Sequence, residues 1–176
     1  MSNNEKRQIL KPRIHESVFI AEGARIYGDV EIGQGSSIWF NAVVRGDEGK
    51  ITVGSNTNIQ DNTVLHSDLT VGTRIGDGVT IGHGAIIRGC TIGNNTMIGM
   101  NATVMTNAEI GNDSVVGANT FVPYNKKFPP RSLIMGVPAR LVRELRSEEL
   151  GMGKIATDIY EKLKKKYTDG EIIGHS

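Results

Sequence analysis

The sequence predicts an all-β solenoid with triangular coils, followed by one C-terminal α-helix. Isoleucine, valine or leucine returns every sixth residue along most of the 176-residue chain. This period fits neither an amphipathic helix nor a half-buried strand, whereas a short flat segment that ends in a bend, repeated many times, produces it. The 22 glycines, which show no collagen triplet, indicate the many tight bends that such a fold needs.

The repeating aliphatic residues define the coils. They form four strict six-residue series, over residues 20–44, 53–65, 75–87 and 92–122, and together they number 17. Each of these residues marks one flat segment, and three flat segments close one triangular coil. The 17 residues therefore predict just under six coils within residues 18–123, with residues 1–17 as a lead-in. The aliphatic side chains would point inward and stack on their counterparts one coil away, roughly 4.8 Å along the axis.

Three segments depart from the period. The intervals at residues 45–51 and 66–73 are longer than six and predict loops that leave the solenoid. Residues 124–146 contain several prolines, which exclude a long helix there. We therefore expect residues 124–146 to form an extended segment that runs back along the solenoid.

The last part of the chain, residues 147–176, predicts one helix and its tail. Ile155, Ile159 and Leu163 recur at a spacing of four, with charged residues between them. This pattern is typical of an amphipathic helix that is too short to form a second domain. We expect it to dock along the outer wall of the solenoid or to cover a neighbouring subunit.

Composition limits the partners and the compartment. A net charge of +1 argues against nucleic acid or an anionic membrane as the main partner. No apolar run approaches the roughly 20 residues needed to span a bilayer, and residues 1–10 lack the apolar stretch of a signal peptide. The single cysteine, Cys90, excludes an internal disulfide and is compatible with a reducing compartment. The composition therefore predicts a cytoplasmic protein.

The six-residue period also places polar side chains relative to one another. Three aliphatic residues that stack on one face are each followed by a residue with a polar or charged side chain. These followers are Arg45, His66 and Arg88. The period therefore places His66 between two arginines, one coil below it and one coil above it.

A second histidine falls on the preceding face. His83 comes two positions after an inward-facing residue, and its counterpart one coil below is Asp61, with Gln60 beside it. His66 and His83 therefore do not converge within one subunit. They could converge if identical subunits pack side by side, and a triangular prism suits a three-fold axis.

Five motifs, taken in order, resemble one known family. They are V-R-G-D (44–47), N-I-Q-D (58–61), V-L-H (64–66), I-G-H-G (81–84) and G-C-T-I-G (89–93). Together they resemble the γ-class carbonic anhydrases, which are left-handed parallel β-helices of hexapeptide repeats. The ending F-P-P-R-S-L-I-M-G-V-P-A-R (128–140) and a following helix that carries Tyr160 are also typical of that family. The resemblance covers almost the whole chain.

This resemblance implies a homotrimer that interconverts CO2 and bicarbonate at zinc, or at another divalent metal, between subunits. In the family, two histidines of one subunit and one histidine of its neighbour hold the metal. When the family's ligand positions are carried over to this sequence, they fall on His66 and position 88 in one chain and on His83 in the next. The resemblance also implies that Gln60 aligns the metal-bound hydroxide, with Asp61 and Arg45 as supports. It implies that Tyr160 lines the pocket, and that Arg45 and Asp47 form an ion pair at the trimer interface.

The chain departs from the family at the third ligand. The family usually has I-G-H-x-x-x-x-H, whereas this chain reads I-G-H-G-A-I-I-R and ends on Arg88. A guanidinium keeps its proton and has no lone pair for a metal, and catalytic zinc needs about three protein ligands. Two histidines could still hold zinc weakly if Arg88 turned away to a carboxylate such as Asp61, and Asp68 is a further candidate ligand. We therefore expect CO2 hydration to be weakened or lost.

Two alternatives remain open at the level of sequence. The first is an acyltransferase that uses a CoA thioester, with His83 as general base to a hydroxyl or an amine. The second is a non-catalytic scaffold in which Arg88 has converted the metal site into a site for bicarbonate or another carboxylate. Gln60 could also simply cap a coil edge, and Tyr160 could simply pack against the solenoid.

Overall fold

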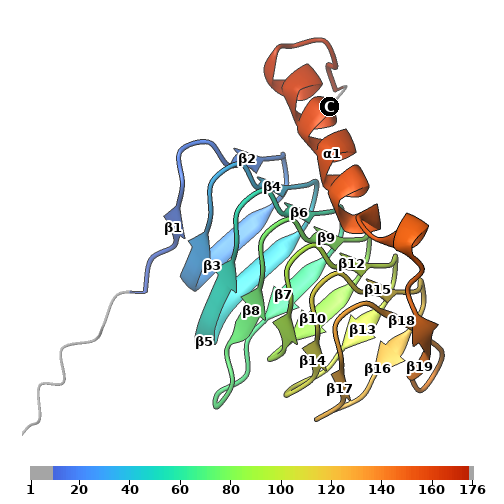
Figure 1. Ribbon diagram of the computed structural model, residues 1–176. Coiled ribbons are helices and arrows are strands. Elements are labelled where there is room, and N and C mark those ends of the chain that lie inside the picture. Colours follow the sequence, from blue (N-terminus) through green and yellow to red (C-terminus); the bar gives the residue numbers. More distant parts are fainter. Residues whose placement is uncertain (1–9, 175–176) are drawn as a thin grey trace, which may run out of the picture.

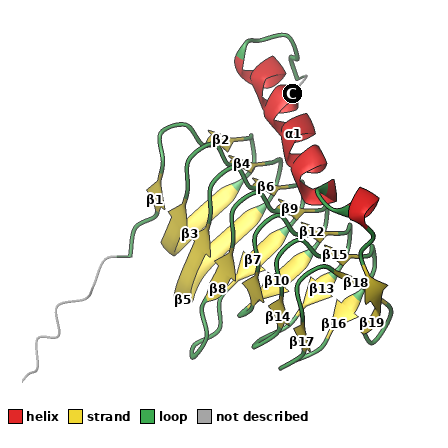
Figure 2. Cartoon of the chain, viewed as in Figure 1, coloured by secondary structure: helices red, strands yellow, loops and turns green. Residues whose placement is uncertain are grey.

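The computed structural model describes residues 10–174 and shows a three-sided parallel solenoid of about seven turns with one helix beside it (Figure 1). This architecture agrees with the predicted left-handed parallel β-helix. The first nine residues of the predicted lead-in and the last two residues of the tail lie outside the described part. The strands are short and the bends between them take most of the chain (Figure 2).

The strands form three faces, which we number by the order in which the chain meets them. Face 1 contains β1 (Arg13–Ile14), the end of β3 (Arg25–Ile32), the end of β5 (Val43–Val53), β8 (Thr73–Ile75), β11 (Thr91–Ile92), β14 (Glu109–Ile110) and β17 (Lys127–Phe128). Face 2 contains β2 (Phe19–Ile20), β4 (Ser37–Ile38), β6 (Asn58–Ile59), β9 (Thr80–Ile81), β12 (Met97–Ile98), β15 (Val115–Val116), β18 (Ser132–Met135) and β19 (Arg140–Glu144). Face 3 contains the beginnings of β3 and β5, with β7 (Val64–His66), β10 (Ile86–Arg88), β13 (Thr103–Val104) and β16 (Phe121–Val122).

The predicted inward stacking is confirmed on face 3. Val44 pairs with Leu65, Leu65 with Ile87, and Ile87 with Val104 in parallel register. All four side chains are fully buried and belong to one continuous core. Because register is fixed by this core, the residues that follow these four are fixed in the same order along the edge of the face.

The solenoid is longer than the predicted just under six coils. Ile14 already pairs with Ile32, while Phe128 stacks on Ile110 and Ile134 on Val116. The predicted return segment 124–146 is therefore largely part of the solenoid, and only β19 runs antiparallel to the strand before it. The prolines exclude a helix there, as predicted, but they are compatible with the bends between faces.

The first predicted loop is a strand instead. Residues 45–51 belong to β5, which continues without a break from face 3 to face 1. It can do so because the long strand β3 pairs with it on both sides of the corner, for example Tyr27 with Arg45 and Val30 with Ile51. The second predicted loop does leave the strands, between His66 and Thr73.

The predicted helix is present as α1 (Met152–Thr168), preceded by the single 3-10 turn η1 (Ser147–Glu149). It lies along face 2, where it contacts β4 and β9 (Figure 1). The ring of Trp39 is buried beneath it and packs edge-on against Tyr160 and Tyr167 of the helix. Within residues 10–174, no helix is long and apolar enough to cross a membrane.

Two of the three aliphatic residues that predicted the helix are exposed. Ile155 is 61% exposed and Ile159 is 56% exposed, whereas Gly153 and Thr157 face the solenoid. A side chain at Gly153 would collide with the backbone of Asn95, since an added Cβ would lie 2.4 Å from that carbonyl oxygen. The helix therefore approaches face 2 through small residues and leaves Ile155 and Ile159 exposed.

Candidate functional site

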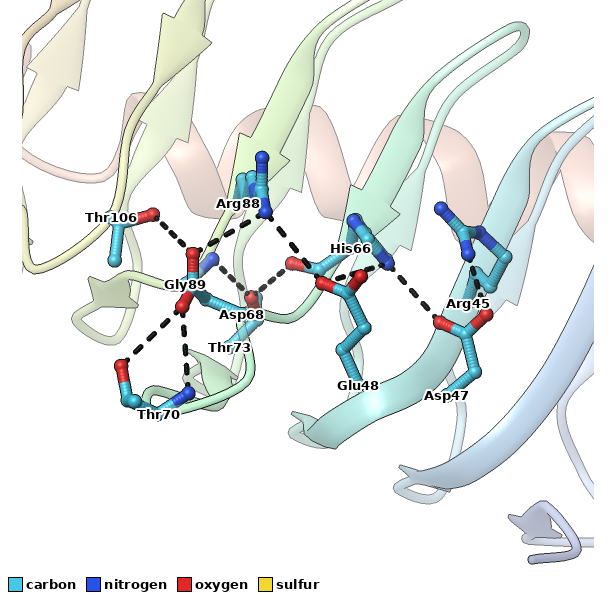
Figure 3. A network of polar contacts seen from close by, with 10 residues as sticks. All are labelled: Arg45, Asp47, Glu48, His66, Asp68, Thr70, Thr73, Arg88, Gly89 and Thr106. Carbon is cyan, nitrogen blue, oxygen red and sulfur yellow. Dashed lines mark hydrogen bonds and ion pairs between the residues drawn. The ribbon is translucent and has the colours of Figure 1, made fainter.

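One cluster of polar residues lies at the corner between faces 3 and 1, which we call the His66 corner. Arg45 pairs with His66, and His66 with Arg88, in the ladder of parallel strands, as the six-residue period predicted. Figure 3 shows these side chains as a row along the edge. Arg45 forms an ion pair with Asp47, and Asp47 Oδ1 lies 3.1 Å from His66 Nε2. Burial raises the pKa of Asp47, but hydrogen bonds from Arg45 and His66 outweigh it and hold the pKa below its usual value.

Two further carboxylates surround Arg88 in this row. Its Nη2 atom lies 3.6 Å from Glu48 Oε2 and 3.4 Å from Asp68 Oδ2 (Figure 3). Glu48 Oε2 is also 3.9 Å from His66 Nε2, so this carboxylate stands between the histidine and the arginine. Asp68, which the sequence offered as a metal ligand, thus neutralises Arg88 instead. Carboxylates therefore stand between the nitrogen-bearing side chains along the whole corner.

A second cluster lies at the corner between faces 2 and 3, which we call the His83 corner. His83 Nδ1 is 2.7 Å from Asp61 Oδ2, and its Nε2 is 3.2 Å from the hydroxyl of Tyr160. The backbone N–H of His83 donates to Gln60 Oε1 at 3.2 Å, and Gln60 Nε2 donates to Asn58 at 3.1 Å. Asp61 therefore orients the imidazole, and Nε2 is left as the acceptor. Burial and the charge of Asp61 raise the pKa of Tyr160 to about 12.

The structure thus brings some of the predicted residues together and keeps others apart. Asp61, which the sequence offered as a partner for Arg88, pairs with His83 instead. Arg45 and Asp47 already pair within one chain. Glu48 was missed because it lies in the segment that was expected to loop away, although it directly follows Asp47.

The donor set does not fit a catalytic zinc. Among residues 10–174, no three histidine, cysteine, aspartate or glutamate side chains of one chain are arranged to hold a metal ion. His83 has the orienting carboxylate that metal-bound histidines usually have. Even if a neighbour supplied that imidazole next to His66, the third position would hold the guanidinium of Arg88, which has no lone pair.

The two corners are separated by face 3, whose outward side chains are largely apolar. They form one ladder across the face, from Val43 through Val64, Ile86 and Thr103 to Phe121. Val64 and Ile86 are exposed in the isolated chain. Face 3 is therefore an apolar surface with one histidine at each of its edges.

A groove of about 390 Å³ opens between α1 and face 2, next to the His83 corner. His83, Gln60 and Tyr160 line its polar end. Thr80 of β9 and Gly82 also line the groove, and the rest of the lining comes from β12, β15, the bends that follow them, and the helix. The apolar lining residues are Met97, Ile98, Met100, Val115, Val116, Ala118, Met152, Ala156 and Ile159.

The three-sided solenoid, with its six-residue period, defines the class of hexapeptide-repeat proteins. In agreement, residues 11–46 and 89–123 match the family described as bacterial transferase hexapeptide (six repeats). A probable carbonic anhydrase of Methanocaldococcus jannaschii is 51% identical over 137 residues, which are 78% of this chain and 86% of that relative. This protein belongs to the γ-class carbonic anhydrase family of hexapeptide-repeat proteins.

Of two further comparisons, the first agrees with this family and the second with the fold. The mitochondrial γ carbonic anhydrase 2 of Arabidopsis thaliana is 42% identical over 145 residues, which are 79% of this chain and 52% of that relative. The crystal structure of a putative acetyltransferase from Bacillus cereus superposes with a TM-score of 0.88 at 38% identity, covering 91% of this chain and 93% of that one. The relatives thus carry the names of two classes of enzyme.

Proposed function

We propose that the protein is a cyclic homotrimer that binds CO2 and bicarbonate at three intersubunit sites and interconverts them slowly. The observation that carries the proposal is the placement of the two histidines at opposite edges of one apolar face. If face 3 of three copies turns toward a common axis, each His83 corner meets the His66 corner of the next copy. The same arrangement covers the exposed Val64 and Ile86.

The residues on the two sides of such an interface have complementary chemistry for this reaction. The His83 imidazole would act as the base through Nε2, because Asp61 holds Nδ1. The hydroxyl of Tyr160 lies 3.2 Å from Nε2, so it has to turn aside before Nε2 can take a proton from water. The water oxygen bonds to the carbon of CO2 and the electron pair of one C=O bond moves to its oxygen. Arg88 of the next subunit would bind the bicarbonate that forms, for which its guanidinium has to turn away from Glu48 and Asp68, the two carboxylates beside it.

Gln60 takes a positioning role in this proposal. It is buried, and both ends of its amide are already used, by the backbone N–H of His83 and by Asn58. Tyr160 limits the position of the imidazole from the helix side. No step depends on zinc, since only two of the family's three ligands are present, and this is why the proposed hydration is slow.

The test is a CO2-hydration assay combined with metal analysis of the wild type and Arg88→His. We expect the wild type to hold little metal, and Arg88→His to bind about one zinc per subunit and to hydrate CO2 on the order of 100-fold faster. Arg74→His is the matched control, because Arg74 is an exposed arginine on face 1. If Arg88→His gains neither metal nor rate, position 88 is not where the third ligand belongs.

A second candidate function is acyl transfer from a CoA thioester, and the apolar groove beside His83 favours it. His83 would remove the proton of a hydroxyl or an amine as that atom attacks the thioester carbonyl carbon, and the thiol would leave with a proton. Turnover of acetyl-CoA by metal-free protein, lost in His83→Ala, would establish this activity. Absence of turnover with a panel of small amines and alcohols would rule it out for those acceptors.

A further inference from the structure

We propose that the trimer binds one oxyanion, such as inorganic phosphate, on its three-fold axis, between the Arg25 side chains of the three subunits. This inference rests on the trimer proposed above and adds a site that lies apart from both histidine corners. Arg25 carries the inference, because it is the one charged residue in the outward ladder of face 3.

The register of the strands places Arg25 in this ladder. It is the first residue of β3 and pairs with Val43, which pairs with Val64. The members above Arg25 are Val43, Val64, Ile86, Thr103 and Phe121, none of which is charged. Paired residues of neighbouring strands lie about 4.8 Å apart and form one column. A three-fold axis that faces Val64 and Ile86 therefore faces Arg25 as well.

Arg25 lies at the open N-terminal end of this column. The strand β1 pairs with the end of β3, on face 1, so no strand within residues 10–174 pairs beneath the beginning of β3 (Figure 1). An arginine side chain is also longer than the valine and isoleucine side chains above it. Three subunits would therefore bring three guanidinium groups together at the end of the axis, where solvent and small ions can enter.

The guanidinium of Arg25 has no ion-pair partner in the described part of the chain. The side chain is exposed, and within residues 10–174 it forms no ion pair and no side-chain hydrogen bond. Arg13 and Arg45, by contrast, each pair with carboxylates of their own chain. Glu22 lines the same open hollow of about 480 Å³ as Arg25 but forms no ion pair with it. The positive charge of Arg25 is therefore available to a ligand.

Three such groups around one axis define the chemistry of the ligand. Their like charges repel and weaken the trimer unless an anion lies between them. A guanidinium presents its N–H donors in a planar fork and binds phosphate and similar oxyanions through paired hydrogen bonds. A tetrahedral oxyanion has three equivalent oxygens around one axis, which matches three equivalent donors. Because one subunit supplies only a third of the site, binding is coupled to assembly.

The experiment titrates the full-length protein with inorganic phosphate, with chloride at equal ionic strength as the reference. Calorimetry should give one phosphate for three chains. In analytical ultracentrifugation, phosphate should lower the concentration at which trimers dissociate by at least tenfold. Arg25→Met should lose both effects, and without phosphate its trimers should persist to lower concentration than those of the wild type, because the repulsion is gone. Its CO2 hydration should be unchanged, since Arg25 belongs to neither histidine corner.

The matched control is Arg74→Met, which removes an exposed arginine from the outward side of face 1 and should keep the wild-type response. Far-UV circular dichroism checks that both variants are folded. One phosphate per chain, or a phosphate response that persists in Arg25→Met, would overturn the axial site. Wild-type trimers that do not respond to phosphate would also overturn it and leave the proposed function standing. A wild type that is monomeric at all concentrations, with and without phosphate, would overturn the trimer and with it the proposed function.

Discussion

The His83 corner and the His66 corner hold one histidine each, yet their surroundings differ in kind. His83 Nδ1 lies 2.7 Å from the carboxylate of Asp61, and its Nε2 contacts Tyr160 of the helix, which packs on the buried ring of Trp39. His66 lies in a row of partly exposed carboxylates and arginines, where Asp47 is 3.1 Å away and Glu48 is 3.9 Å away. The first corner has the orienting carboxylate that metal-bound histidines usually have, whereas the second has a guanidinium at the position that the resemblance gives to the third ligand.

This difference implies that, in the proposed intersubunit site, the two halves can change separately. The His83 corner depends on packing beneath α1, so its geometry should be lost with the packing. The His66 corner depends on charges that water and salt screen. Substitutions at the two corners should therefore differ in size as well as in the property that they change.

The largest expected effect is on the packing under the His83 corner. Trp39→Ala should lower the free energy of unfolding by about 3–5 kcal/mol, because it leaves a cavity between β4 and α1. Arg45→Ala at the other corner should cost at most about 1 kcal/mol, since its ion pair is exposed. Urea unfolding of both variants measures the two values. Equal losses in the free energy of unfolding would contradict the claim that packing holds the His83 corner and exposed charges hold the His66 corner.

A smaller effect is expected on catalysis in the Arg88→His background. Asp61→Asn should lower the hydration rate by about tenfold or more, because it removes the one acceptor that orients His83. Asp47→Asn should have a smaller effect, since Glu48 lies near the same nitrogen of His66 and can replace it. Measuring kcat/KM for both variants compares the corners directly. A larger loss in Asp47→Asn would reverse the assignment of roles.

The smallest expected effect is on the pH dependence of stability. The pKa of Asp47 is lowered in the folded chain, so its contribution is present above the usual value of 3.8 and is lost as the pH falls below it. The thermal midpoint of the wild type should therefore fall more between pH 5 and pH 3 than that of Asp47→Asn. Identical pH profiles would show that Asp47 contributes nothing to the His66 corner.

Much of the site could be predicted from the sequence, because a solenoid converts spacing into position. The stack of Arg45, His66 and Arg88 follows from the period alone, and so does the placement of Asp61 beneath His83. These predictions held because each inward residue must stack on its counterpart to stay buried. The hydrogen-bond and ion-pair partners along one edge were harder to predict, since a long arginine side chain can reach several carboxylates.

The errors have the same physical origin. Glu48 was missed and Arg88 was paired with the wrong carboxylate, because the continuation of β5 around the corner depends on pairing with β3. Spacing within one segment does not contain that information. The last coils were missed because prolines were taken to end the solenoid, whereas Phe128 and Ile134 keep the six-residue spacing across them.

The most direct test of an intersubunit site is complementation between two inactive chains. In the Arg88→His background, His66→Ala and His83→Ala should each lose zinc and activity as homotrimers. Mixed trimers of the two should regain both at about one site in three, because only one junction then joins an intact His66 corner to an intact His83 corner. Mixed trimers as inactive and metal-free as the parents would contradict the account.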